Sequence, residues 1–179
     1  MIATTRLMLR PPQLGDASAL ARLMTEDVSR WTAAWPYPLS EAAAREKLRE
    51  TLAAMAAGQC FARAIARPGH DDAIGWLGVA LIASAPPTGS LGYWLGAAFH
   101  RQGYLSEALP PFVQAAIAVL RLSRLETGVQ PANAASLALL RRLGMRFVET
   151  RMHHVPARRR EELTAFYAMD CSSAFSPSR

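Results

Sequence analysis

The sequence predicts a single α+β domain, and three observations lead to this fold class. The chain has 179 residues with 51% apolar content, enough for one domain that buries roughly 70% of its unfolded surface. Short strand patterns alternate with longer helical patterns along most of the chain. Residues 90–146 give the most specific order: a strand, a Gly-containing basic turn and a long apolar helix, then a second strand and helix. We expect the domain to span residues 1–170 and the Ser/Pro-rich tail, residues 171–179, to be frayed.

The charge of the chain is basic, at +6, and is carried almost wholly by arginine, since Lys47 is the only lysine. Such a bias can indicate an anionic partner or simply an Arg- and Ala-rich genome. The basic residues are scattered apart from Arg141-Arg142 and Arg158-Arg159-Arg160, so a nucleic-acid partner is not expected. Without a run of about 18 apolar residues or a signal-peptide pattern, the sequence indicates a cytoplasmic protein.

The two cysteines indicate neither a disulfide nor a metal site. Cys60 and Cys171 lie far apart, and neither belongs to a CxxC motif or has a His at metal-ligand spacing. His153 and His154 are adjacent in a predicted strand, so they face opposite sides of the sheet and do not share a metal. We therefore expect no metal in this protein.

The N-terminal elements follow from alternation, capping residues and prolines. Thr5–Arg10 alternates polar with apolar residues and is expected to be a strand. Asp16 is expected to cap a short helix after it. Ser29–Leu39 is a predicted loop, because two prolines interrupt it. Ser40 should cap the next helix and Gly58 should end it.

The middle of the chain predicts three strands and a long helix. Phe61–Ala66 and Ile74–Ala83 are apolar enough to be strands. Ala85–Gly89 is expected to be a turn, and Leu91–Leu95 a further strand. A helix is predicted over Tyr104–Leu120, where large apolar residues recur at helical spacing.

The C-terminal third predicts a strand, a helix and a hairpin. Leu125–Val129 is expected to be a strand, and Ala134–Leu143 a helix that Gly144 ends. Phe147–Val155 and Leu163–Met169 are expected to pair as a hairpin across a charged turn. We interpret that turn, which contains the three consecutive arginines, as solvated.

Five pieces of this sequence, in order and spacing, resemble the GNAT acetyltransferases, and within them the group of ribosomal-protein N-terminal acetyltransferases. The pieces are Thr5–Arg10 with Asp16-Ala17, Leu91–Leu95, Gly103–Leu109, Asn133–Ser136 and Leu139–Arg146. The resemblance covers about residues 4 to 170. It implies a mixed, mostly antiparallel sheet flanked by about four helices, with the fourth and fifth strands splayed apart. Acetyl-CoA would occupy that gap, with its acetyl group facing an acceptor amine.

Two adjacent phosphates need several converging backbone N–H groups, and a Gly-containing turn that opens a helix supplies them. Here that turn is His100–Leu105, in which Gly103 allows close approach and Arg101 adds charge. The alternative interpretation is an ordinary strand-to-helix turn. The resemblance implies cofactor contacts by Leu95, Arg101, Gln102, Gly103, Tyr104, Leu105, Ser106 and Asn133.

Acetyl transfer to an amine needs a polarised carbonyl and a proton for the departing thiolate. The resemblance implies that Asn133 binds the pantetheine arm and that Ser136 donates this proton. It also implies that a backbone N–H near Leu95 polarises the carbonyl. The alternative makes Asn133 an N-cap and Ser136 an exposed residue of the first helical turn. The two interpretations are compatible.

The sequence departs from the family pattern at three places. His100 and Leu105 replace the residues usual at the start and end of the cofactor turn. Pro110-Pro111 falls in the second helical turn, where proline costs about 3 kcal/mol. A kink, or a helix that starts only near Leu109, is therefore expected. Ser90 stands where many relatives carry an acidic base, and no obvious carboxylate replaces it.

Three aromatic residues, Trp31, Trp35 and Tyr37, lie on the Pro-rich loop that borders the acceptor site in the fold resembled. They form either a wall for the substrate or part of the core. Tyr93 or Glu149 could assist proton removal through water.

The leading functional hypothesis is an N-acetyltransferase that transfers the acetyl group of acetyl-CoA to a primary amine, either a protein N-terminus or a small amine. Direct attack in a ternary complex is expected, because no Cys or Ser has a His partner that would indicate an acyl-enzyme. The alternative is a catalytically inactive GNAT-fold module that binds an acyl-CoA, and a nucleic-acid-binding domain rests on charge alone. A monomer or homodimer is expected.

Overall fold

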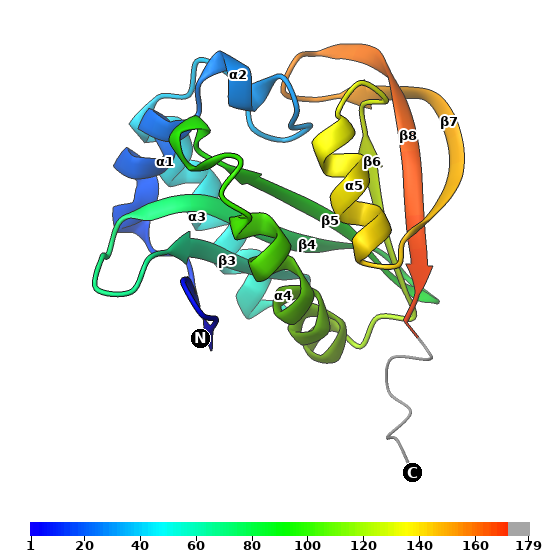
Figure 1. Cartoon of the computed structure of the whole chain (residues 1–179), viewed down its shortest axis with the longest axis horizontal. Helices are drawn as coiled ribbons and strands as arrows, with labels where there is room; N and C mark the ends of the chain where they lie inside the picture. The colour runs from blue at the N-terminus through cyan, green and yellow to red at the C-terminus, as the bar shows by residue number, and fades with distance from the viewer. Residues whose placement is uncertain (172–179) are drawn as a thin grey trace.

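The structure, a computed structural model, describes residues 1–171; residues 172–179, where most of the predicted frayed tail falls, lie outside the described part. Eight strands form one sheet in the order β1-β2-β3-β4-β5-β6-β8-β7 (Figure 1). The elements are β1 (Ile2–Ala3), β2 (Met8–Arg10), α1 (Ala17–Leu23), α2 (Glu26–Ser29), α3 (Glu41–Ala56), β3 (Cys60–Ala66), β4 (Ala73–Ser84), β5 (Pro87–Leu95), α4 (Tyr104–Leu120), β6 (Arg124–Val129), α5 (Ala134–Arg142), β7 (Arg146–Val155) and β8 (Arg160–Asp170).

The sheet lies between two layers of helices, and each layer covers its own buried core. One core packs α4 and α5 against the sheet and includes Leu77, Phe112 and Leu140. The other packs α1 and α3 against the opposite face and includes Leu20, Leu48 and Trp94. Successive side chains of a strand point to opposite faces, which explains how neighbouring residues of β5 enter different cores. No helix within residues 1–171 is long and apolar enough to cross a membrane.

The sheet is mostly antiparallel, but β5 and β6 run parallel and soon separate. They pair only where Thr88–Ser90 lies beside Arg124–Glu126. The next contact is made by a side chain, since Thr127 Oγ1 donates to the Leu91 carbonyl at 2.8 Å. Beyond it the strands diverge. The predicted splay between the fourth and fifth strands is therefore confirmed, and in the present numbering these strands are β5 and β6.

The helix α4 begins at Tyr104 and continues through both prolines. The expectation of a later start near Leu109 is therefore wrong. The first turn forms ahead of the prolines, because the Glu107 N–H donates to the Gly103 carbonyl at 3.1 Å. Burying each large side chain of this helix contributes about 1.5–3 kcal/mol, which offsets the cost of the prolines. Its buried residues are Ala108, Leu109, Phe112, Val113, Ala116, Ile117 and Leu120.

Two predicted boundaries were wrong for physical reasons. Only Met8–Arg10 of the first predicted strand pairs in the sheet, as β2, because the polar groups of Thr4 and Arg6 bind Glu107 instead. The turn predicted to last until Gly89 ends earlier, and β5 begins at Pro87. Gly89 is packed within the sheet, where an added Cβ would lie 2.7 Å from side chains of the core.

The helix caps are confirmed at Ser40 but not at Asp16. Ser40 Oγ accepts from the Ala43 N–H at 3.1 Å at the start of α3. Asp16 occupies the N-cap position of α1 but makes no side-chain cap. Its carboxylate instead accepts from the Gln13 N–H at 2.8 Å and pairs with the Arg10 guanidinium. This pair ties β2 to the start of α1.

Candidate functional site

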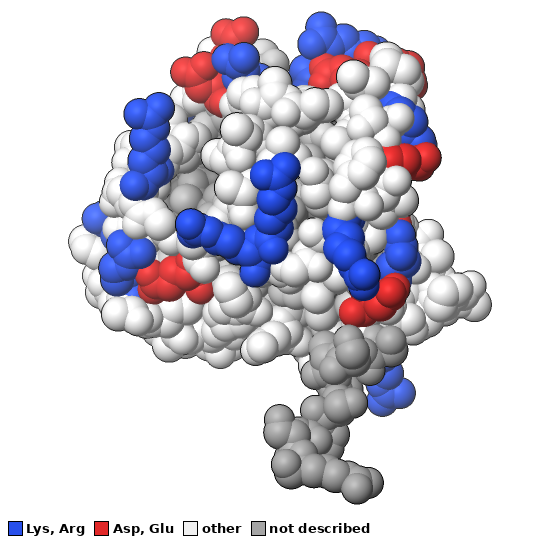
Figure 2. All heavy atoms as spheres, turned by 45° about the vertical axis from the view of Figure 1, so that its right-hand side comes forward, with Lys and Arg blue, Asp and Glu red and all other residues white. Residues whose placement is uncertain are grey.

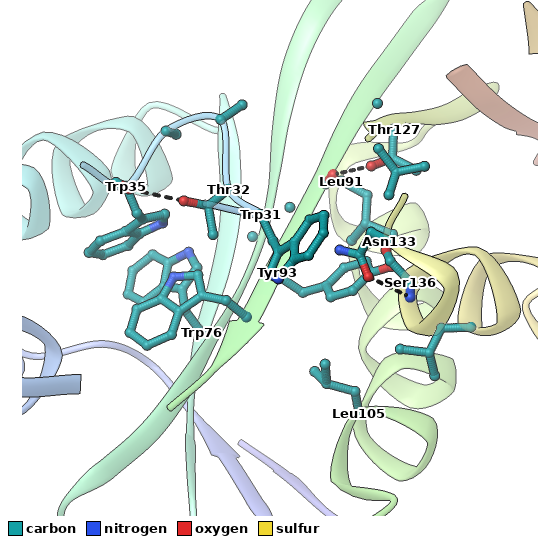
Figure 3. A pocket seen from close by; sticks show the side chains of 18 of the residues that line it. Trp31, Thr32, Trp35, Trp76, Leu91, Tyr93, Leu105, Thr127, Asn133 and Ser136 are labelled. Carbon is teal, nitrogen blue, oxygen red and sulfur yellow. Dashed lines mark hydrogen bonds between the residues drawn. The ribbon is translucent and has the colours of Figure 1, made fainter. Parts of the chain in front are cut away.

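A continuous cleft of about 1230 Å³ runs through the gap between β5 and β6. On the α4 side it is lined by Tyr104, Leu105 and Ser136, and on the opposite side by Trp31 and Trp76, among others. Figure 3 shows the Tyr93 side chain between these two groups of residues. The cleft therefore opens on both faces of the sheet, so a molecule bound on one face can meet a molecule bound on the other.

The turn at the start of α4 presents unpaired backbone donors to this cleft. Within residues 1–171, no acceptor takes the N–H groups of Tyr104, Leu105 or Ser106. These are the first three amides of a helix, which carry its partial positive charge. Gly103 has a φ of +77° and Arg101 a φ of +60°, and this left-handed backbone turns the chain into the helix. Such a group of amides is suited to binding an anion.

A set of polar contacts from the N-terminus fixes this turn. Arg6 donates to the Gln102 carbonyl at 2.9 Å and to the Glu107 carboxylate at 2.7 Å. Thr4 Oγ1 also donates to Glu107, at 2.6 Å. Burial opposes ionisation of Glu107, but these hydrogen bonds outweigh it and lower the pKa of its carboxyl group. The Arg6 guanidinium also lies 4.8 Å from the centre of the Tyr104 ring.

Leu105 is half-buried, and its side chain packs against the core shared by α4 and α5. It borders a small second cavity between these helices. The side chain therefore packs partly against protein and partly lines the cleft, while its backbone N–H has no acceptor among the described residues. Gln102, also predicted to contact the cofactor, lies outside the cleft lining, and its side-chain amide donates to the Ala98 carbonyl.

Basic side chains lie along the cleft on the side of α4 and α5. Arg101 and Arg142 line the cleft, and Figure 2 shows basic side chains across the middle of one face, with acidic ones mostly toward its edges. A cleft with this charge attracts an anionic ligand.

The predicted residues Asn133 and Ser136 lie together at the start of α5. Asn133 Oδ1 accepts from the Ser136 N–H at 3.1 Å, so its interpretation as an N-cap is confirmed. The Ser136 hydroxyl is 2.6 Å from the Tyr93 hydroxyl, across the gap from β5. Burial raises the pKa of Tyr93 to about 12, against a smaller opposing effect of the bond to Ser136. Tyr93 therefore stays protonated at any physiological pH.

The end of β5 directs backbone groups into the gap. Gly96 donates to the Ile74 carbonyl on the β4 side at 3.0 Å. Because backbone groups alternate along an antiparallel strand, those of Leu95 point away from β4 and toward β6. The Leu95 carbonyl accepts from His100 Nε2 at 2.9 Å, so His100 holds the turn to the end of this strand. The N–H of Leu95 faces the cleft.

The aromatic residues of the Pro-rich loop divide between wall and core. Trp35 is 5% exposed and lies edge-on to Trp76 and Trp94, with ring centres 5.2 Å away in both cases. Trp31 lines the same cleft as Tyr93 (Figure 3). Tyr37 is exposed and lies outside the lining.

The charged turn between β7 and β8 is not simply solvated, as the sequence had suggested. Arg158 donates to both Glu162 carboxylate oxygens and to the carbonyls of Ser29 and Thr32. These bonds lower the pKa of Glu162 to about 2, and the bond from Arg158 contributes most. The turn thus anchors the loop that carries Trp31. The sequence offers no local signal for this contact, because its partners are more than 120 residues apart.

Comparison with known proteins gives a consistent picture. Residues 6–146 match the family model described as acetyltransferase (GNAT) domain. A Bacillus licheniformis N-acetyltransferase, p20, is 28% identical over 141 residues, which are 78% of this chain and 79% of the relative.

Solved structures share the fold at low sequence identity. A ribosomal-protein-S5-alanine acetyltransferase from Vibrio fischeri superposes with a TM-score of 0.84 at 14% identity, covering 98% of each chain. A ribosomal L7/L12 α-N-protein acetyltransferase in complex with coenzyme A gives 0.79 at 20% identity, covering 94% of this chain and 96% of that one.

Proposed function

Because this chain belongs to the GNAT family of acetyl-CoA-dependent N-acetyltransferases, we propose that its acceptor is a primary amine, either a protein N-terminus or a small amine. The amine attacks acetyl-CoA directly within a ternary complex. The observation that carries this proposal is a single cleft that extends through the sheet. On one face it reaches the amides of Tyr104, Leu105 and Ser106, which have no acceptor among the described residues. On the other face it reaches the aromatic compartment, which is lined by Trp31 and Trp76.

The start of α4 binds the diphosphate of acetyl-CoA. The donors are the N–H groups of Tyr104, Leu105 and Ser106, which have no acceptor among the described residues. Gly103 lets the diphosphate approach, because an added Cβ there would touch only the end of the Arg6 side chain, at 3.5 Å. Arg101 contributes charge from the edge of the cleft. The residues present therefore fit an extended, phosphate-bearing cosubstrate.

The thioester end lies between β5 and α5. Acetyl-CoA supplies an activated acyl group, and the chain has to orient it, polarise its carbonyl and return a proton to sulfur. The N–H of Leu95 faces the gap and polarises the thioester carbonyl. The side-chain amide of Asn133, which has no acceptor among the described residues, binds the pantetheine arm. Ser136 gives its proton to the departing thiolate and is reprotonated through Tyr93, whose hydroxyl lies 2.6 Å away.

Direct transfer, without an acyl-enzyme, is supported by the protonation state of the Cys60 thiol. Cys60 lines the aromatic compartment, and burial raises the pKa of its thiol. A neutral thiol is a poor nucleophile. Ser136 is paired with Tyr93 and not with a histidine, so neither residue is activated to carry an acyl group.

Two measurements test the proposal. Calorimetry with acetyl-CoA should give saturable binding, and a free-thiol assay against panels of primary amines and unblocked peptides should detect release of CoA. The N-acetylated form of each acceptor is the control and should release none. Binding without turnover over the whole panel would indicate an acyl-CoA-binding module instead, and absence of binding would exclude both functions.

A further inference from the structure

The face of the sheet opposite α4 has an uncovered floor built from glycines. Gly78 of β4 lies directly opposite Gly92 of β5 in the sheet, and Gly128 of β6 also lines the cleft. An added Cβ at Gly92 would meet no atom within 4 Å. Glycine in the middle of a central strand often marks a place where a ligand approaches the backbone. The surface over Gly92 therefore has room for a second substrate, whereas a Cβ added at Gly78 or Gly128 would meet Trp76 or Thr164.

Ser90 and Gly92 point to the same face, because side chains alternate along β5. Glu126 stands beside Ser90, since these two residues are partners in the parallel pairing of β5 with β6. Paired residues on adjacent strands place their side chains on the same face. Glu126 therefore lies one strand away from Ser90, the position where the family pattern has an acidic residue.

Glu126 is the one acidic residue among the described residues that line the cleft. Its side chain is 29% exposed, and its nearest charged partner is Arg124, at 3.5 Å. Arg124 also approaches Asp170, at 3.7 Å. Glu126 thus has one long ionic contact, and the other charged residues that line the cleft are basic. Glu126 is therefore the lining residue that attracts a positively charged group entering the cleft.

We propose that Glu126 binds the ammonium group of the acceptor and takes the place of the carboxylate missing at Ser90. This inference rests on the proposed function and names the residue that receives the amine. An α-amine has a pKa of about 8 and is mostly protonated at pH 7. An ionised carboxylate attracts this form, which concentrates the acceptor beside the gap.

The proton balance of the reaction follows. The bound ammonium loses one proton, which Glu126 passes to solvent, and becomes a neutral amine. The amine nitrogen forms a bond to the acetyl carbonyl carbon while the carbon–sulfur bond breaks. The second proton leaves the nitrogen for solvent, and the thiolate gains one from Ser136, which is reprotonated from solvent through Tyr93. The products are an amide and free CoA, with one proton released for each ammonium consumed.

The experiment compares Glu126→Gln with Asp170→Asn. Both changes remove a carboxylate near Arg124, but Asp170 lies outside the cleft lining. The probes are tri-alanine amide and its N-acetyl form. Their affinity for the CoA-saturated protein is measured by calorimetry, which does not require turnover. CoA release from acetyl-CoA with tri-alanine amide is measured in parallel.

For Glu126→Gln we expect about tenfold weaker binding of tri-alanine amide at pH 6.5 and a similar rise in its KM. The loss should shrink above pH 9, where the amine is neutral. Acetyl-CoA affinity should stay within about twofold, and Asp170→Asn should behave as the wild type. Adding Ser90→Glu to the Glu126→Gln variant should recover most of the binding, because it returns a carboxylate to the adjacent strand.

Three results would overturn the inference. They are equal affinity of the wild-type protein for the free amine and its acetylated form, unchanged amine binding in Glu126→Gln, and a defect in Glu126→Gln that is independent of pH or extends equally to acetyl-CoA. Failure of the proposed function is a different result, namely no release of CoA with any amine.

Discussion

The hydroxyl groups of Tyr93 and Ser136 lie 2.6 Å apart and bridge β5 and α5 across the gap in the sheet. The two residues are 43 positions apart in sequence. Ser136 is fixed from the other side, because its N–H donates to Asn133 Oδ1. The start of α5 is thereby held at a set distance from β5, and a proton can pass between the two hydroxyls.

Replacing Ser136 by Ala should lower kcat by about 10²-fold, the lower range for loss of a general acid. The affinity for acetyl-CoA, measured by calorimetry, should change less than threefold, because the amides at the start of α4 remain. Tyr93→Phe should lower kcat less, since Ser136 keeps its own proton. An unchanged kcat in Ser136→Ala would remove this residue from the mechanism.

The raised pKa of Tyr93 predicts a loss of stability at high pH. Folding holds the phenol proton up to about pH 12, whereas the unfolded chain loses it near pH 10. The unfolded state therefore binds fewer protons in this window, and stability falls as pH rises from 10 to 12. The loss in the free energy of unfolding over this range is about 2–3 kcal/mol. Melting temperatures should fall more steeply for the wild type than for Tyr93→Phe, and parallel curves would contradict the prediction.

Gly103→Ala should weaken acetyl-CoA binding about tenfold. Its φ of +77° strains any residue with a Cβ by about 1–2 kcal/mol, and relief of that strain moves the amides that follow. Gly144→Ala is the matched control, because Gly144 has a φ of +79° and open space around it. Calorimetry should show the defect only at Gly103. Equal losses in both variants would mean that general strain, not the position of the amides, sets the affinity.

Gly92 offers a way to block the acceptor without touching the phosphate site. Leu at this position would project into open space over the floor of the cleft. We expect Gly92→Leu to bind acetyl-CoA normally and to lose at least tenfold in kcat/KM for the amine, with Gly92→Ala in between. Normal turnover in Gly92→Leu would show that the acceptor enters elsewhere.

Glu162 should stabilise the protein only above acidic pH. Its pKa is lowered to about 2 from an ordinary 4.5, so the unfolded state binds more protons between these values. Stability should therefore fall as pH drops from 4.5 toward 2. Glu162→Gln should flatten this acid dependence in melting curves. Glu161→Gln is the control, since Glu161 is exposed and contacts His154 at 3.5 Å; an equal effect there would refute the role of Glu162.

Local signals predicted much of the fold. Ser40 and Gly144 mark helix ends as expected, and the helix over Tyr104–Leu120 has the predicted bounds. These features depend on residues a few positions apart. The prolines of α4 led to the wrong expectation of a helix start near Leu109. Their cost is outweighed by packing that only the folded chain provides.

The site could be predicted only in part. The residues at the starts of α4 and α5 follow from the family pattern, but their supports do not. Glu107 is held by Arg6 from 101 positions away, and Glu126 meets Ser90 only through strand pairing. Contacts of this kind leave no spacing or periodicity in the sequence.

The central claim is that the first amides of α4 bind the diphosphate of acetyl-CoA. Amide resonances of ¹⁵N-labelled protein, followed during titration with acetyl-CoA, test it most directly. We predict saturable shifts of Tyr104, Leu105 and Ser106 that inorganic phosphate reproduces weakly and at the same residues. Saturation with these three amides unmoved would contradict the account.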